Sequence, residues 1–246
     1  MKTETVWLDE LTMPKAEEAA KKGRIVILPV GSVEEHGKHL PLCTDCLQPE
    51  NIAIEVARKV DCLVAPPIRY GVCTETRYFP GTISIGFDSL YSMVCDVLDE
   101  LVRQGFKRLI VLSGHAGSLH MAALKLAARD VLDKYAEESE HRVLRILVLS
   151  DYDFAYELRG RQFDERDGHG GEIETSRILA IRPDLVKGRT EKNFLEMPRF
   201  EIVANPGDYW PDGIKGDPSK ASAEKGKTAN KYIIGKMLAL VKELGE

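Results

Sequence analysis

Three glycine-flanked turns of the chain carry histidines and carboxylates of the types that bind metal ions. The turns are Glu34–Gly37, which Asp45 follows closely, Gly114–Gly117 and Gly168–Glu174. Each turn holds one of the six histidines, namely His36, His115 and His169, and the remaining three are His39, His120 and His141. Imidazole and carboxylate together suit Zn, Mn or Fe(II), and a carboxylate can bridge two such ions. The three turns therefore indicate a metal site.

The spacing of Glu34 and His36 supports this interpretation. The residues are two apart, so both side chains leave the same face of an extended segment and can converge on one point. A single turn of this kind favours a polar loop with surface histidines, because short motifs often match by chance. Three such turns at the ends of predicted strands favour the metal site instead.

Buried strands alternate with helices along the chain. Continuous apolar runs predict strands at Arg24–Gly31, Cys62–Pro66, Lys107–Ser113 and Arg142–Ser150. Apolar residues at helical spacing predict helices at 49–60, with Pro49 as the first helical residue, and at Ser89–Gln104, Ser118–Tyr135, Glu172–Ile181 and Ala223–Leu244. Residues 151–171 and 191–222 are polar or rich in proline and are expected to be irregular.

This alternation predicts an α/β fold. Strand–helix–strand connections are right-handed and build a mostly parallel sheet with helices on both faces, which is a three-layer αβα sandwich. A chain of 246 residues fits one such domain, residues 1–246. Parallel sheets bind ligands beyond the carboxyl ends of their strands, where the three turns lie.

The composition excludes several classes of partner. Lys and Arg number 34 against 39 Asp and Glu, a net charge of −5, and no basic block offers a surface to nucleic acid or to an anionic membrane. No apolar run approaches the roughly 18 to 20 residues of a membrane span, and residues 1–10 lack the apolar core of a signal peptide. A cytoplasmic protein with a small-molecule partner is therefore expected.

The chain has five cysteines, an odd number without an export signal, so we expect reduced thiols rather than a disulfide framework. Cys43 and Cys46 form a C-x-x-C pair. No second pair exists to complete a zinc site, and we expect no redox or metal role for it.

The motifs resemble those of the creatininase (creatinine amidohydrolase) family. The resemblance runs in order through most of the chain: Pro29–Ser32, Glu34–Gly37, Leu40–Asp45, Phe79–Thr82, Gly114–Gly117, His169–Ser176, Gly216–Pro218 and Ala223–Gly226. It implies an αβα fold with a dinuclear metal centre at the strand ends, which hydrolyses non-peptide C–N bonds, commonly in cyclic amides. The resemblance also implies a homo-oligomer, a hexamer.

The resemblance implies five ligands for two divalent metal ions, which would be Zn, Mn or Fe. Carried over by position, Glu34, Asp45 and His115 would hold one ion. His36, Asp45 and Glu172 would hold the other, with Asp45 as the bridge. Two ions roughly 3.5 to 4 Å apart need such a shared carboxylate.

Other residues are expected to act on the substrate. His169 resembles the catalytic histidine of the family, and a purely structural role is its open alternative. Ser113 ends the strand Lys107–Ser113 and Gly114 follows it, and both are expected substrate contacts. Tyr78 is a further expected contact, although its region fits a polar loop equally well.

The chain departs from the creatininase pattern in ways that leave the substrate open. Creatininase itself has Glu at the place of Gly117 and none at the place of Glu172, and this chain has the reverse. Trp7 and Trp210 give no clear counterpart of the tryptophans that enclose creatinine. The expected reaction is hydrolysis of an amide, cyclic amide or formamide C–N bond by water that the two ions activate. Cleavage of a peptide precursor and a catalytically silent metal-binding scaffold are the alternatives.

Overall fold

Four parallel strands form the sheet in the computed structural model, which describes residues 5–136 and 143–245. In spatial order they are β2 (Cys62–Val64), β1 (Ile25–Val30), β3 (Arg108–Ser113) and β4 (Arg145–Ser150). Val30 pairs with Ser113, and Ser113 pairs with Ser150, so β1, β3 and β4 end at the same level. The segments that follow these strands therefore start from one common edge.

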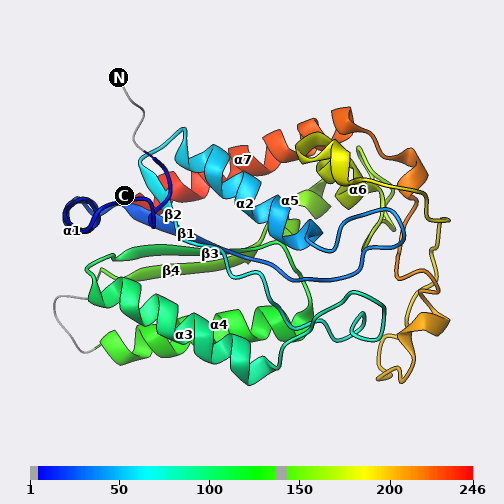
Figure 1. Ribbon diagram of the computed structural model, residues 1–246, viewed down its shortest axis with the longest axis horizontal. Coiled ribbons are helices and arrows are strands. Elements are labelled where there is room, and N and C mark those ends of the chain that lie inside the picture. The colour runs from blue at the N-terminus through cyan, green and yellow to red at the C-terminus, as the bar shows by residue number, and fades with distance from the viewer. Residues whose placement is uncertain (1–4, 137–142, 246) are drawn as a thin grey trace.

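Helices cover both faces of the sheet, as Figure 1 shows. One face carries α2 (Thr44–Ala57), α5 (Tyr152–Ala155), α6 (Glu172–Ile181) and α7 (Ala223–Gly245), and the other carries α3 (Phe87–Arg103) and α4 (Ser118–Tyr135). The helix α1 (Met13–Lys21) precedes β1, and short 3-10 helices lie at Tyr156–Leu158, Pro183–Leu185, Pro206–Asp208 and Pro218–Lys220. The predicted α/β class, a three-layer αβα sandwich with a parallel sheet, is confirmed.

The apolar core is divided by the sheet into two clusters. Alternate residues of β1 point to opposite faces: Val26 and Leu28 pack with α3 and α4, whereas Ile25 and Ile27 pack with α2 and α7. Each side chain is buried, which explains why the strand is apolar without alternation. Burial of each Leu or Ile contributes about 1.5 to 3 kcal/mol, so both layers are held firmly against the sheet.

The helix α2 begins earlier than predicted. It starts at Thr44, so Pro49 lies inside the helix and not at its first position. The first turn, Thr44–Gln48, is polar and largely buried, and it gave no apolar stripe to recognise. Proline has no N–H to donate to the carbonyl of Asp45 four residues before it, so the turn depends on tertiary packing.

Most other boundaries agree with the sequence within three residues. The helices α4 and α6 match their predicted ranges. Two differences are α1, which was not predicted, and the region after β4, where α5 and a 3-10 helix stand in a segment expected to be irregular. Arg142, the first residue of the strand predicted at 142–150, lies outside the described residues, as do His141 and residues 1–4. Among the described helices none is both long and apolar enough to cross a membrane.

Candidate metal centre

Asp45 reaches the carboxyl edge of the sheet because two glycines let the first turn of α2 approach closely. A side chain on Gly31 would place its Cβ 2.5 Å from the Asp45 carbonyl oxygen, and one on Gly114 would place it 2.2 Å from the same atom. Gly31 follows β1 and Gly114 follows β3. These two strands lie side by side, and the helices that follow them, α2 and α4, cover opposite faces of the sheet. Such a switch point is where parallel sheets hold ligands.

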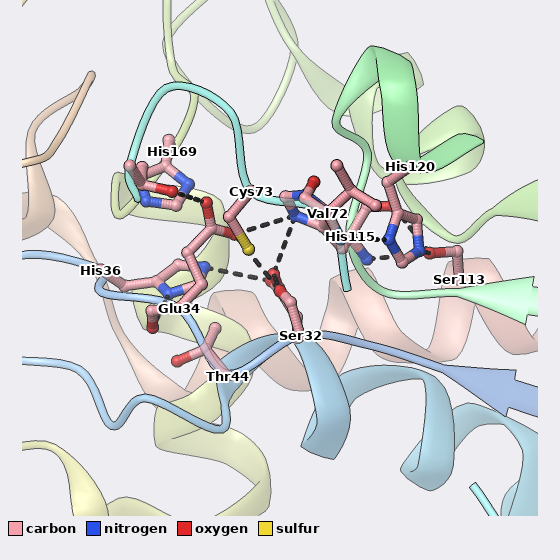
Figure 2. Close-up of polar contacts among 12 residues, drawn as sticks. Ser32, Glu34, His36, Thr44, Val72, Cys73, Ser113, His115, His120 and His169 are labelled. Carbon is pink, nitrogen blue, oxygen red and sulfur yellow. Dashed lines mark hydrogen bonds and ion pairs between the residues drawn. The ribbon is translucent and has the colours of Figure 1, made fainter. Parts of the chain in front are cut away.

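The carboxylate of Asp45 lies between two histidines. Its Oδ1 is 3.0 Å from His36 Nε2, and its Oδ2 is 3.1 Å from His115 Nδ1. Glu34 joins the His115 side, with its Oε2 2.8 Å from His115 Nδ1. Ser32 donates a hydrogen bond of 2.6 Å to Asp45 Oδ2 and fixes the orientation of this carboxylate. Figure 2 shows Glu34, His36 and His115 converging from the segments after β1 and β3.

Both histidines are oriented by backbone carbonyls. His36 Nδ1 donates to the Glu34 carbonyl at 3.0 Å, and His115 Nε2 donates to the Val72 carbonyl at 3.0 Å. A proton held on the outer nitrogen leaves the inner nitrogen with a free lone pair, which is the arrangement of a metal-ligating histidine. The inner nitrogens, His36 Nε2 and His115 Nδ1, are the ones that face Asp45.

The structure brings Glu174, and not Glu172, to this centre. Glu174 Oε2 lies 3.4 Å from His36 Nε2, and the Gly170 N–H donates to it at 2.6 Å. Glu172 instead forms an ion pair with Lys225 of α7. Residues two apart on a helix face different sides, so only one of these two glutamates can face the cluster. Glu174 therefore occupies the position at the cluster that was expected of Glu172.

His169 is close to the same centre. Its ring is 4.2 Å from that of His36 and stacks on Trp210 with a centroid distance of 5.9 Å and an interplanar angle of 7°. Its Nε2 donates to the Glu35 carbonyl at 2.7 Å. Gly170, with φ at +62°, gives the turn a left-handed conformation that glycine adopts readily. The ring of His169 is thus held at the rim of the centre by its hydrogen bond to the Glu35 carbonyl and by its contacts with the rings of His36 and Trp210.

A cavity of about 280 Å³ opens onto the centre. Gly114, one of the predicted substrate contacts, lines it. Ser113 is fully buried, is not part of the lining, and donates to the His115 carbonyl at 2.7 Å, so its role in the structure is to shape the turn. Tyr78 is 69% exposed and does not line the cavity either. Three other hollows among the described residues are larger, and no residue of the cluster lines any of them.

Comparisons with known proteins agree with the family resemblance of the sequence motifs. A sequence profile described as "Creatininase: Creatinine amidohydrolase" matches residues 9–241. The chain belongs to the creatininase family. The creatinine amidohydrolase of Pseudomonas putida is 34% identical over 199 residues, 75% of each chain. The mycofactocin precursor peptide peptidase of Mycolicibacterium smegmatis is 33% identical over 217 residues, 82% of this chain and 78% of that protein. A crystal structure of creatininase aligns at a TM-score of 0.88, with 27% identity and 98% of both chains covered.

Creatininase-family members are amidohydrolases that act on C–N bonds, and this chain is accordingly a metal-dependent hydrolase. Creatininase structures described as a Zn–Zn type and as a manganese form align at TM-scores of 0.86 and 0.83. In this chain, the described residues contain three groups whose possible ligand atoms lie within 4.8 Å of one another: Glu34, Cys73 and His115; Glu34, His36 and His169; His36, Asp45 and Glu174. These groups and the creatininase structures support the binding of divalent metal.

The electrostatics of the centre follow from burial and from opposite charges. Burial would lower the pKa of His36 and of His115, but nearby carboxylates outweigh it and raise both well above the usual value. Burial alone would raise the pKa of Asp45, but the two histidines outweigh it and hold this pKa well below the usual range. Buried carboxylates need positive partners, which protonated imidazoles or metal ions can supply.

Sequence reasoning missed three residues around this creatininase-family centre. Glu174 lies in the segment His169–Ser176, which carries part of the family resemblance. The helical period could have shown that Glu172 and Glu174 face different sides of the helix. Cys73 is buried beside Glu34 and His115, and nothing in the sequence around it signals a ligand. Trp210 belongs to a proline-rich loop 41 positions after His169 in the chain, so only tertiary structure reveals their stacking. Cys43 and Cys46 belong to no candidate metal group among the described residues.

Proposed function

We propose that this chain hydrolyses the C–N bond of an amide, a cyclic amide or a formamide in a small molecule, at a centre of two divalent ions. The single observation that carries the proposal is the position of Asp45. One of its oxygens faces His36, whose inner nitrogen also meets Glu174, and the other faces His115, which also meets Glu34. A carboxylate shared between two ligand groups is what two ions about 3.5 to 4 Å apart require.

The donor set fits such ions. In each group a histidine donates from its outer nitrogen to a backbone carbonyl and turns its inner nitrogen towards a buried carboxylate, where a metal ion would take the place of a proton. Mixed nitrogen and oxygen ligands accept Zn, Mn or Fe, and these three metals are the candidates. When bound, two divalent ions acidify a water molecule and polarise a carbonyl oxygen. Ser32 and Thr76, which donate to Asp45 and Glu34, keep the carboxylates in place.

His169 is the proposed proton donor to the departing nitrogen. An amide anion is a very poor leaving group, so this nitrogen needs a proton, and an imidazole can supply it. His169 lines the cavity and is held by the Glu35 carbonyl and by Trp210. Because its ring nitrogen also lies within 4.8 Å of ligand atoms of Glu34 and His36, a ligand role is its alternative.

The size of the cavity favours a small substrate. Small-molecule sites usually measure about 300 to 1,000 Å³, and about 280 Å³ lies just below that range. Among the relatives, one is named for creatinine and another for a precursor peptide, so a short peptide end is the competing substrate. A homo-oligomer and a cytoplasmic location stay predictions, and light scattering after size-exclusion chromatography tests the first.

Hydrolysis assays on a substrate panel test the proposed function. Metal-loaded protein is assayed with lactams, formamides, cyclic ureas and short peptides, and chelator-treated protein and Asp45→Ala serve as controls. We expect hydrolysis of at least one small amide by the loaded wild type, and none by either control. No turnover of any compound would contradict the proposal and favour a silent metal-binding scaffold. Turnover of peptides alone would favour the peptidase alternative.

A further inference from the structure

The wall of the cavity carries two cationic side chains besides the metal-binding cluster. Arg159 and Lys215 both line it. The Lys215 ammonium is already paired, because its Nζ lies 2.7 Å from a carboxylate oxygen of Glu196. In the part of the chain that the structure describes, no carboxylate lies within ion-pair distance of the Arg159 guanidinium. Arg159 is therefore a cation without a counter-ion at the substrate cavity.

The environment of Arg159 is too enclosed for an ordinary surface arginine. The residue is half-buried, and its Nε is fully buried without a hydrogen-bond partner. Removing a charged group from water costs free energy unless an opposite charge or hydrogen bonds compensate for it. A ligand in the cavity is the partner that is missing from the protein itself.

The guanidinium is also held in a defined position. It stacks on Tyr156, with its central carbon 3.3 Å from the centre of the ring. The turn that follows is closed by a bridge between Arg159 and Phe163 and by a hydrogen bond of 2.9 Å from the Gly160 N–H to the Phe163 carbonyl. Stacking occupies the flat face of a guanidinium and leaves its in-plane N–H groups to bind an oxyanion in a fork.

We propose that Arg159 binds an anionic group of the substrate, a carboxylate or a phosphate, while the C–N bond lies at the metal centre. Arg159 offers only donors, so it selects acceptor groups, and an anion is the acceptor it binds best. The substrate is therefore an acidic amide. Creatinine, which carries no carboxylate or phosphate, is not the expected substrate. This inference rests on the proposed function, because it places the bond to be cleaved at the metal centre.

Three matched formamides test the proposal. N-formylglycine carries a carboxylate, N-(formylaminomethyl)phosphonate carries a phosphonate, and N-formylglycinamide is neutral. Calorimetry gives the dissociation constant of each with metal-loaded wild type, Arg159→Met, Arg159→Lys and Arg161→Met. Arg161 is exposed and two residues further on, so Arg161→Met removes the same charge from the same loop.

We expect the wild type and Arg161→Met to bind an anionic formamide at least tenfold more tightly than the neutral one, as charge-assisted hydrogen bonds provide. Arg159→Met should lose this preference, and Arg159→Lys should keep part of it because it retains the charge without the fork. Whichever of the carboxylate and the phosphonate binds more tightly identifies the anion. The proposal would be overturned if the wild type bound all three formamides equally or bound none of them. It would also be overturned if Arg159→Met kept the full preference for the anionic formamides, because the metal ions would then be the anion site.

Release of formate in the same solutions is a separate readout. If no formamide is hydrolysed but the preference depends on Arg159, the anion site stands and the proposed hydrolysis of formamides fails. If hydrolysis occurs and Arg159→Met does not change the preference, the proposed function stands and the anion site fails.

Discussion

Glu172 and Glu174 stand two residues apart in the first turn of α6 and face different partners, Lys225 and His36. The N-terminus of α6 is held by Asp167, which accepts hydrogen bonds of 2.6 and 2.9 Å from the N–H groups of Glu172 and Ile173. This cap sets the rotation of the helix, and the rotation decides which glutamate meets the metal centre.

The two glutamates should respond differently to the same substitution. Glu174→Gln removes a ligand charge at the His36 side, and we expect the protein to lose about one of two metal equivalents and most of its activity. Glu172→Gln breaks the ion pair with Lys225 and should keep both metals while lowering the free energy of unfolding by about 1 to 3 kcal/mol. Metal analysis after dialysis and urea unfolding measure the two effects. Equal metal content in the two variants would contradict the assignment.

Gly114 should tolerate no side chain. A Cβ there would lie 2.2 Å from the Asp45 carbonyl oxygen and 2.5 Å from Pro49 Cδ, so Gly114→Ala must push the first turn of α2 away from the sheet. Overpacking of this kind costs about 1 to 3 kcal/mol, and we expect weaker metal binding as well.

Gly235 in α7 is the matched control, since a Cβ there meets nothing within 4 Å. Gly235→Ala should stabilise the protein by about 0.5 to 1 kcal/mol, because alanine is a better helix former than glycine. Thermal unfolding and metal titration compare the two variants. A Gly114→Ala protein with wild-type stability and metal affinity would show that the close approach is not required.

His169→Ala separates chemistry from metal binding. If His169 donates a proton to the leaving group, the variant should keep both metals and the fold, and its kcat should fall by about 100-fold or more. Metal content, circular dichroism and kcat on the best substrate of the panel are measured together. Loss of a metal ion would make His169 a ligand, and unchanged kcat would assign the proton transfer to another group.

His39 should make stability depend on pH. Burial, aided by the charge of His36, lowers the pKa of His39 to about 4, and its two ring nitrogens are hydrogen-bonded to the hydroxyls of Thr175 and Thr190 at 2.7 and 2.8 Å. The unfolded chain, with a histidine pKa of about 6.5, binds more protons between these values. Stability is therefore fully present above pH 6.5 and is lost as the pH falls towards 4, by roughly 3 kcal/mol.

The variant His39→Gln checks this pH dependence. The variant loses the hydrogen bonds of His39 at every pH, but its glutamine binds no proton. Its free energy of unfolding should therefore lie further below that of the wild type at pH 7.5 than at pH 5. Urea unfolding at the two pH values measures this difference, in which the titration of other groups cancels. A deficit that stays constant would mean that His39 does not titrate on unfolding.

The sequence predicted most of what depends on local patterns. Continuous apolar runs located β1 and β3, and helical periodicity located α4 and α6 with their ends. Glycine-flanked turns at strand ends pointed to Glu34, His36 and His115, and the family resemblance added Asp45; the structure brings these four residues together.

The features that depend on tertiary contacts could not be predicted in this way. The first turn of α2 has no apolar stripe and forms because Gly31 and Gly114 leave room for it. Tyr78 follows the polar segment Thr74–Arg77 and is exposed, although its neighbour in sequence Thr76 is buried against Glu34. Arg159 lies in a segment read as irregular, and its stacking on Tyr156 depends on the short helices after β4.

The proposed function requires two metal ions that share Asp45. Anomalous diffraction from a crystal of protein loaded with zinc or manganese can show this arrangement, because the anomalous peaks locate each ion. Two ions that share Asp45 would give two peaks about 3.5 to 4 Å apart on either side of it, one beside Glu34 and His115 and the other beside His36 and Glu174. A single peak, or a second ion bound by Glu172 instead of Glu174, would contradict this arrangement.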